Sequence, residues 1–219
     1  MHPDFWYERW QSNQIGFHLL EANPLLVKHF YALNLTPKTP KKNSPRVFLP
    51  LCGKTLDIAW LLAQGYQVVG AELSQIAVED LFIQLNLTPK ITQNSDFIHF
   101  SSANIDIFVG DIFKLTPKIL GKVDAIYDRA ALVALPDEMR KAYTAHLLAL
   151  TNKAPQLLIC FEYDQNLHVG PPFSISADEV RKHYQTQHDL TLLSSESMTD
   201  GLKGKFPATE QVWLLTPKS

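Results

Sequence analysis

A glycine turn and an acid further along the chain form the part of this sequence best suited to bind a nucleotide-like ligand. The apolar run 46–51 leads into a turn at Gly53, and the next apolar run, 67–71, ends in Glu72, 19 positions after Gly53. At the edge of a parallel sheet, such a turn lets backbone approach a ligand, and the acid can accept hydrogen bonds from a ribose diol. The spacing favours this role for Glu72 over the alternative, an acid that caps the helix expected to begin near Ser74.

The residues of the turn limit the classes of ligand that it could bind. A dinucleotide fingerprint needs three glycines to bring a pyrophosphate onto a helix N-terminus, and here Lys54 and Thr55 follow the single Gly53, so NAD and FAD fit poorly. A phosphate-binding P-loop would need a further glycine where Phe48 stands. The turn therefore indicates an adenosine-containing ligand without a phosphate at that point; the alternative is an ordinary strand-to-helix turn.

Two more strand ends carry charged residues. Asp111 and Ile112 follow the third strand expected in the core. Asp111 could accept from an adenine amino group with Ile112 against the ring, or it could cap a helix. Arg129 follows Asp128 at the end of the fourth core strand, where a charge is costly unless it is paired or faces a ligand. We expect Arg129 to bind a ligand carboxylate or to face an anionic nucleophile; the alternative is an ion pair with Asp128.

Aromatic side chains near the N-terminus form a further candidate group. Trp6 and Trp10 are spaced to share one face of a helix, and Phe17 follows them. A cap built from these rings could exclude water from a site and pack against a cation, although such residues also build ordinary cores. His18 could be a base or a structural histidine. Pro172 lies in a stiff Gly-Pro-Pro-Phe loop that could wall an acceptor pocket or form a simple rigid turn.

Alternating strand and helix patterns must position these residues. Such alternation predicts an α/β fold with a mostly parallel sheet, right-handed crossovers and a closing antiparallel pair at one edge. An extended run at 96–100 is expected as a hairpin-like excursion before the third core strand. The expected core strands are 46–51, 67–72, 105–109, 123–127, 156–163, 190–195 and 210–215, and the expected helices after the N-terminal one are 55–64, 74–86, 137–150 and 177–187.

Length and charge limit the number of domains and the kinds of partner that this protein could have. The 219 residues predict one domain, with 1–45 as an N-terminal cap and Pro/Lys connector and 46–219 as the core. The net charge of −2 disfavours a nucleic-acid partner. A signal peptide and an apolar run of about 20 residues are both missing from the sequence, and its two cysteines lack close histidines. We therefore expect a cytoplasmic, monomeric protein with reduced thiols, no metal and a small-molecule substrate.

Six blocks of the sequence resemble the thiopurine S-methyltransferase family, in the order in which the family has them and across essentially the whole chain. The short N-terminus resembles the bacterial branch. The blocks are Trp6-Tyr7-Glu8-Arg9-Trp10, Ile15-Gly16-Phe17-His18, Leu49-Pro50-Leu51-Cys52-Gly53-Lys54, Gly70-Ala71-Glu72-Leu73-Ser74, Tyr127-Asp128-Arg129-Ala130-Ala131-Leu132 and Gly170-Pro171-Pro172-Phe173.

The resemblance implies a Rossmann-like class I methyltransferase fold with a seven-stranded sheet, and S-adenosyl-L-methionine as cofactor. It implies acceptor contacts from Phe17 and Pro172, of which Phe17 would also touch the cofactor. Arg129 would be the catalytic residue as well as a cofactor contact. The cofactor contacts that the resemblance implies are Trp6, Trp10, Leu51, Glu72, Asp111, Ile112 and Arg129.

The implied reaction is methyl transfer to the sulfur of aromatic or heterocyclic thiols such as thiopurines. The alternatives are methylation of selenium or tellurium compounds or other soft nucleophiles in detoxification, and a non-catalytic ligand-binding protein on the same fold. In the region 196–208, animal members supply a second acceptor-contacting arginine, whereas this chain has only Lys203 and Lys205.

Overall fold

The centre of the protein is a mixed β-sheet. The computed structural model describes residues 2–38 and 43–218, so residues 39–42 of the predicted connector lie outside the described residues. Within the described chain, the nine-stranded sheet has the order β3-β4-β5-β2-β1-β6-β7-β9-β8. The strands are β1 (Arg46–Pro50), β2 (Gln67–Glu72), β3 (Lys90–Gln93), β4 (Ile98–Ser102), β5 (Ile105–Val109), β6 (Ala125–Arg129), β7 (Gln156–Glu162), β8 (His188–Ser197) and β9 (Thr209–Pro217).

The five central strands are parallel, as the alternating pattern predicted. β1 pairs with β2 and with β6, β2 pairs with β5, and β6 pairs with β7, all in parallel. The seven predicted core strands are present, and β8 and β9 form the predicted antiparallel edge against β7. The excursion predicted at 96–100 is strand β4, and together with β3 it adds a second antiparallel edge and brings the sheet to nine strands.

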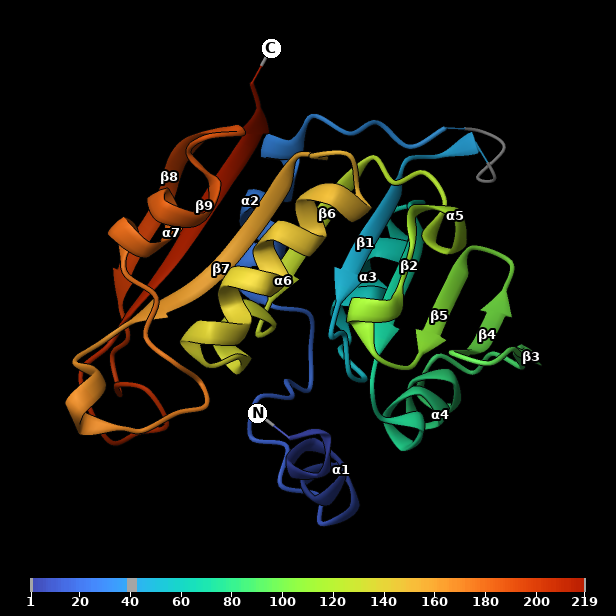
Figure 1. The fold of residues 1–219 in the computed structure, drawn as a ribbon, viewed down its shortest axis with the longest axis horizontal. Helices are drawn as coiled ribbons and strands as arrows, with labels where there is room; N and C mark the ends of the chain where they lie inside the picture. The colour runs from blue at the N-terminus through green and yellow to red at the C-terminus, as the bar shows by residue number, and fades with distance from the viewer. Residues whose placement is uncertain (1, 39–42, 219) are drawn as a thin grey trace.

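Helices cover both faces of the sheet (Figure 1). One buried cluster packs α2, α3 and α4 against one face, and another packs α5, α6 and α7 against the other. The α-helices are α1 (Pro3–Gln11), α2 (Pro24–His29), α3 (Asp57–Ala63), α4 (Gln75–Gln84), α5 (Pro117–Leu120), α6 (Asp137–Leu150) and α7 (Ala177–Tyr184), and the 3₁₀ turns are η1 (Phe30–Leu33), η3 (Ile112–Lys114), η4 (Leu132–Ala134) and η5 (Gln165–Leu167).

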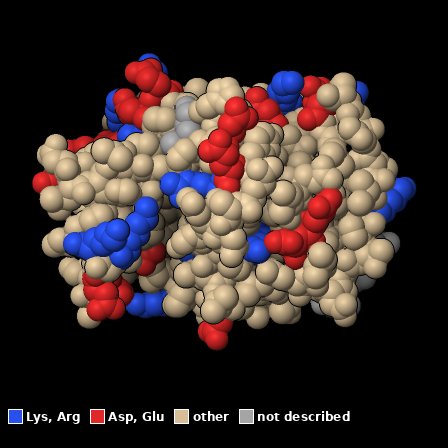
Figure 2. All heavy atoms as spheres, turned by 90° about the horizontal axis from the view of Figure 1, so that it is seen from below, with Lys and Arg blue, Asp and Glu red and all other residues tan. Residues whose placement is uncertain are grey.

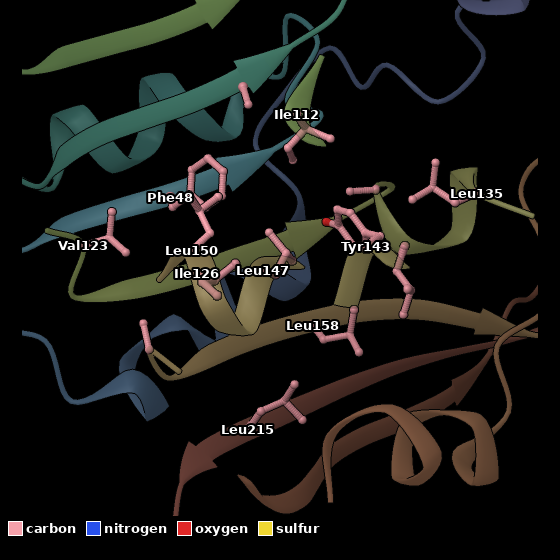
Figure 3. Packing of buried hydrophobic residues seen from close by; sticks show 14 of the residues in the cluster. Phe48, Ile112, Val123, Ile126, Leu135, Tyr143, Leu147, Leu150, Leu158 and Leu215 are labelled. Atoms are coloured by element: carbon pink, nitrogen blue, oxygen red, sulfur yellow. The ribbon is translucent and has the colours of Figure 1, made fainter. Parts of the chain in front are cut away.

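Helix α6 illustrates how the sequence pattern produces the packing. Its buried residues Tyr143, Leu147 and Leu150 recur at helical spacing and therefore share one face. Figure 3 shows this face directed at the sheet, where Leu147 lies near Ile126 and Leu158 of the central strands. The predicted bounds of this helix, 137–150, are confirmed.

The direction in which strands are added to the sheet reverses between β1 and β6. From β1 the chain moves to β2 and β5 on one side, and it later returns to β6 and β7 on the other side. In open α/β sheets, ligands bind at such a switch point, outside the carboxyl ends of the strands. Helix α1 lies beside this edge of the sheet, below the strand tips in Figure 1. The fold thus brings the predicted N-terminal cap to the edge that carries the other candidate residues.

Asp128 on β6 is a buried structural acid and does not pair with Arg129. Its Oδ2 accepts a hydrogen bond from the hydroxyl of Tyr143 at 2.7 Å, and its Oδ1 accepts from the backbone N–H of Leu132 at 3.1 Å. The suggested Asp128–Arg129 ion pair is therefore wrong, because Asp128 points into the core between β6 and α6. Burial raises the pKa of Asp128 to about 6, against the opposing hydrogen bonds from Tyr143, Leu132 and Ala131.

This raised pKa predicts a stability that falls as the pH rises through 6. Since the pKa of Asp128 is 3.8 unfolded and about 6 folded, the native state holds a proton between these values that the unfolded state has lost. Asp128 should therefore make the free energy of unfolding about 1 kcal/mol larger at pH 5 than at pH 7. We expect Asp128→Asn to remove this difference in urea titrations at the two pH values. The same pH dependence in both proteins would contradict the assignment.

Candidate functional site

Glu72 and the turn at Gly53 meet at the carboxyl ends of β1 and β2, as the 19-residue spacing predicted. The backbone N–H of Gly53 donates to Oε2 of Glu72 at 2.8 Å. The backbone N–H of Ser74 donates to Oε1 at 2.8 Å, and the Ser74 hydroxyl in turn caps α4. Glu72 thus ties the first loop to the start of α4. It contacts the Gly53 turn, and it also bonds the residue that caps α4, which is part of the alternative role considered from the sequence.

The carboxylate of Glu72 retains capacity for a ligand. The residue is 6% exposed, and burial raises the pKa of Glu72, although hydrogen bonds from the backbone of Ser74, Gly53 and Leu73 oppose that rise. An ionised carboxylate offers about four lone-pair sites. Backbone N–H groups of Gly53, Ser74 and Leu73 use three of them, which leaves capacity to accept a hydrogen bond from a hydroxyl group of a bound molecule.

Strained backbone stands on both sides of the switch point between β1 and β6. Leu51 directly follows β1 with φ +47°, and Ala130 directly follows β6 with φ +62°. Non-glycine residues in the left-handed region cost of the order of 1–3 kcal/mol and cluster at functional sites. The two strained residues stand on either side of the switch point. This placement supports a functional edge at the predicted residue Leu51.

Arg129 ends β6 at the same edge, half-buried and without an acidic partner among the described residues. Its positive charge acts on His18, where it lowers the pKa after the larger effects of burial and Lys54. It also acts on Glu210 of β9, whose pKa is raised mainly by burial while Arg129 opposes the rise. Arg129 is therefore an available cation close to the cap and to β9.

The cap aromatics pack as one group over the turn. The ring of Phe17 meets those of Trp6 and Trp10 edge-on, at centroid distances of 6.0 Å and 5.5 Å. Trp10 is buried and covers Gly53, where a Cβ would lie 2.9 Å from Cζ2 of Trp10. Gly53 also has φ +53°, so both the close approach of Trp10 and the left-handed backbone conformation favour glycine at this position. The structure thus brings all three predicted aromatics to the edge that carries Glu72.

Asp111 and Ile112 follow β5, next to β2. The backbone N–H of Gly110 donates to the carbonyl of Glu72 at 2.9 Å, which fixes this loop beside the Glu72 strand end. Asp111 is exposed and its Oδ1 accepts from the N–H of Phe113 at 3.0 Å, so it caps η3 as the alternative proposed. Ile112 is buried. Both residues therefore lie at the sheet edge where an adenine is expected. The side chain of Asp111 is the N-cap of η3 in this structure.

Pro172 lies in a loop that the surrounding structure holds firmly. Its carbonyl accepts a hydrogen bond from the hydroxyl of Tyr163 at 2.6 Å. The next residue, Phe173, donates its N–H to the carbonyl of Val133 at 2.7 Å, which ties the loop to the segment after β6. Pro172 therefore lies beyond the end of β7, in a loop tied to the segment that follows β6, and its role as a pocket wall stays a prediction.

Asp57 is a buried acid near the switch point that the sequence analysis did not single out. It is 1% exposed at the start of α3, where its Oδ1 accepts from the N–H of Asn23 at 2.6 Å and its Oδ2 accepts from the hydroxyl of Tyr127 at 3.0 Å. It joins the segment after the cap, at Asn23, to β6, at Tyr127. An acid four residues after the glycine turn was visible in the sequence, but its two partners are distant along the chain.

Two further properties of the described residues bear on the type of site. They include no group of three or more His, Cys, Asp or Glu side chains arranged to hold a metal ion. Within residues 2–38 and 43–218, no helix is both long and apolar enough to cross a membrane. Cys52 and Cys160 are buried, free thiols, and burial is the main cause of the raised pKa of each.

Comparison with known proteins gives a family match over the whole sheet and the cap. The family model described as thiopurine S-methyltransferase matches residues 1–217. A thiopurine S-methyltransferase of Xanthobacter autotrophicus is 54% identical over 216 residues, which are 98% of this chain and 99% of the relative. A protein of the same name from Teredinibacter turnerae is 48% identical over 216 residues, 99% of this chain and 98% of the relative.

Solved structures of low sequence identity share the fold. A SAM-dependent methyltransferase from Anabaena variabilis superposes with a TM-score of 0.63 at 17% identity, covering 99% of this chain and 95% of its own. The 1,6-didemethyltoxoflavin-N1-methyltransferase of Burkholderia thailandensis, solved with S-adenosylhomocysteine, gives a TM-score of 0.64 at 14% identity and covers 98% of this chain and 87% of its own. The fold is that of SAM-dependent methyltransferases.

Proposed function

The chain belongs to the thiopurine S-methyltransferase family, and from this premise we propose that it transfers the methyl group of S-adenosyl-L-methionine to the sulfur of aromatic or heterocyclic thiols such as thiopurines. It is a methyltransferase with the Rossmann-like fold, and S-adenosyl-L-methionine is its cofactor. The observation that carries the assignment to this site is the contact between Glu72 and the Gly53 turn under Trp10, at the switch point of the sheet.

The residues present fit this cofactor. A ribose diol needs a hydrogen-bond acceptor, and the buried Glu72 carboxylate has acceptor capacity beyond the lone pairs that Gly53, Ser74 and Leu73 occupy. A sulfonium cation packs well against aromatic rings, which Trp6 and Trp10 would supply. Leu51 would let backbone approach the ligand at the β1 turn, and Asp111 with Ile112 would border the adenine. When bound, the cofactor supplies an activated methyl group.

The protein's part in the reaction is to position the acceptor and keep its sulfur anionic. Thiolate is the nucleophilic form of sulfur. Arg129 is half-buried, and within the described residues it forms no ion pair, although its charge acts on Glu210. Its charge would stabilise a thiolate that approaches between β6 and the cap. Phe17 and Pro172 would flank the acceptor ring. Holding the two reactants in contact, with water excluded by the cap aromatics, accounts for most of the expected acceleration.

We propose that His18 takes up the proton that the acceptor loses. Burial, Lys54 and Arg129 all lower the pKa of His18, whereas Asp57 raises it. A lowered pKa keeps the imidazole neutral at pH 7, and a neutral imidazole has one nitrogen able to accept a proton. Heterocyclic thiols that are already ionised would not need this step, so His18 would matter most for acceptors with a higher thiol pKa.

Product analysis tests the proposed function. The purified protein is incubated with S-adenosyl-L-methionine and either 6-mercaptopurine or selenite, and methylated products are identified by mass spectrometry. We expect S-methylated 6-mercaptopurine together with an equal amount of S-adenosylhomocysteine. Methylated selenium alone would move the function to metalloid detoxification, and cofactor binding without any product would favour a non-catalytic binding protein.

A further inference from the structure

The turn after β1 carries a lysine to which the proposed function gives no role. A lysine at this position of a P-loop would reach the phosphates of a nucleotide, but the upstream glycine of that motif is replaced here by Phe48. Nζ of Lys54 lies instead 2.8 Å from Oδ2 of Asp80 on α4, and the side chain of Lys54 is 13% exposed. Because partly buried ion pairs are screened less than exposed ones, this pair fixes the ammonium group beside the Gly53 turn.

The fixed ammonium group of Lys54 lies against the cap. It is 5.9 Å from the centroid of the Trp10 ring. Cations within about 6 Å of an aromatic centroid are attracted by the face of the ring. The neighbouring Gly53 leaves room for the same ring, because a Cβ there would lie 2.9 Å from Cζ2 of Trp10. Two adjacent residues of one turn thus receive Trp10, Gly53 through its missing side chain and Lys54 through its charge.

Helix α1 depends on Trp10 for its contact with the core. The helix has nine residues, and isolated helices of fewer than about 12 residues are marginal in water. Within Pro3–Gln11, all of which the structure describes, only Trp10 is buried. The hydrogen bonds found for the described residues 2–14 join residues of this same segment. The contacts that hold Trp10 therefore decide how firmly α1 covers the edge of the sheet.

The contact between Lys54 and Trp10 also links the cap to α4. Helix α1 lies next to α4, which carries Asp80 (Figure 1). Ser74, the N-cap of α4, donates its backbone N–H to Glu72. Figure 2 views the molecule from the side on which α1 lies and shows basic and acidic side chains near one another at several places on a mostly uncharged surface. An ion pair between neighbouring elements, such as Lys54–Asp80, fits this distribution of charge.

We propose that Lys54 is a positioning residue that holds Trp10, and with it helix α1, over the cofactor site. Asp80 fixes the ammonium group, the ammonium group attracts the Trp10 ring, and the ring covers the Gly53 turn. The inference rests on the proposed function, because Trp10 is the ring expected to pack against the sulfonium group of the cofactor. Lys54 acts on the cofactor through the cap and does not touch it.

Cofactor titrations of matched variants measure this role. We expect Lys54→Met to weaken the binding of S-adenosyl-L-methionine about three- to fivefold in calorimetry, which is the size of a single cation–π contact near the surface. Lys54→Arg should stay within about twofold of wild type, because a guanidinium group can also pair with Asp80 and stack on Trp10. The control is Lys28→Met, which removes an exposed lysine 3.0 Å from Glu196 and should leave the affinity within about twofold of wild type.

A double-mutant cycle with Trp10 separates positioning through the cap from direct contact with the cofactor. If Lys54 acts through Trp10, Lys54→Met will change the affinity less than about twofold in a protein that already carries Trp10→Leu. An equal loss of affinity in both backgrounds would overturn the inference, since Lys54 would then act on the cofactor without Trp10. Unchanged affinity in both backgrounds would overturn it as well.

Hydrogen exchange of the cofactor-free protein gives a readout that needs neither activity nor bound cofactor. We expect Lys54→Met to speed up the exchange of the α1 amides about three- to fivefold, with α6 unchanged as the internal reference, and Lys54→Arg to restore the wild-type protection. If the wild-type protein binds no S-adenosyl-L-methionine, the proposed function fails and the exchange of α1 decides the inference. Equal exchange of α1 in wild type and Lys54→Met would overturn the inference, even if 6-mercaptopurine is methylated.

Discussion

Replacement of Glu72 by Gln is expected to weaken the binding of S-adenosyl-L-methionine at least about tenfold. Both carboxylate oxygens accept backbone N–H groups, from Gly53 and from Ser74. A glutamine has one oxygen and one NH₂ group, so one of these N–H groups would face another donor at a buried position. The change removes an acceptor for the ribose and also loosens the turn. Calorimetric titration of both proteins with the cofactor measures the effect.

The control for Glu72→Gln is Glu138→Gln. Glu138 is an exposed acid in the first turn of α6, so its replacement changes the net charge equally without touching the site. We also expect Glu72→Gln to lower the free energy of unfolding by about 1–3 kcal/mol, because a buried N–H loses its partner. An unchanged affinity for the cofactor in Glu72→Gln would reject the role proposed for Glu72.

Arg129→Met should lower turnover about a hundredfold and leave the fold nearly as stable as before. Removing a fixed charge or donor that stabilises an anion at a reacting centre typically costs this much. Arg129 makes no ion pair with a described residue, so its loss breaks no ion pair and removes only its longer-range effect on the pKa of Glu210. Steady-state methylation of 6-mercaptopurine and urea unfolding, both at pH 7, give the two quantities to be compared.

Arg140→Met is the matched control, in which we expect the free energy of unfolding, rather than turnover, to be the quantity that falls most. Arg140 is buried, its Nε lies 2.5 Å from Oε1 of Glu179, and its Nη1 donates to the carbonyl of Leu135 at 2.8 Å. Its loss should lower the free energy of unfolding by about 3–5 kcal/mol, because Glu179 is left partly buried without its cation. If Arg129→Met instead loses stability in proportion to its loss of turnover, Arg129 is a structural residue and the proposed catalytic role is wrong.

The parts of the fold that were predictable are those set by local spacing. The run that ends at Gly53 and the acid 19 positions later predicted two neighbouring parallel strands, and the structure joins them through the Gly53–Glu72 hydrogen bond. The bounds of α6 followed from its apolar period. In each case the deciding signal lies within a few turns of chain, where backbone geometry leaves few alternatives.

The parts that were not predictable depend on partners distant along the chain. Strand β3 is exposed at all four of its residues and has no alternating pattern, so only its pairing with β4 makes it a strand. Asp128 was considered as an alternative partner of its neighbour Arg129, but its partner Tyr143 lies on helix α6, which packs against the sheet.

A crystal structure of the protein with S-adenosylhomocysteine is the most direct test of the central claim, that the cofactor binds at the switch point between β1 and β6. We predict ribose hydroxyls within hydrogen-bond distance of Glu72, with the ligand covered by Trp6 and Trp10 and the adenine beside Ile112. A ligand bound elsewhere, or bound at this edge without contact to Glu72, would contradict the account.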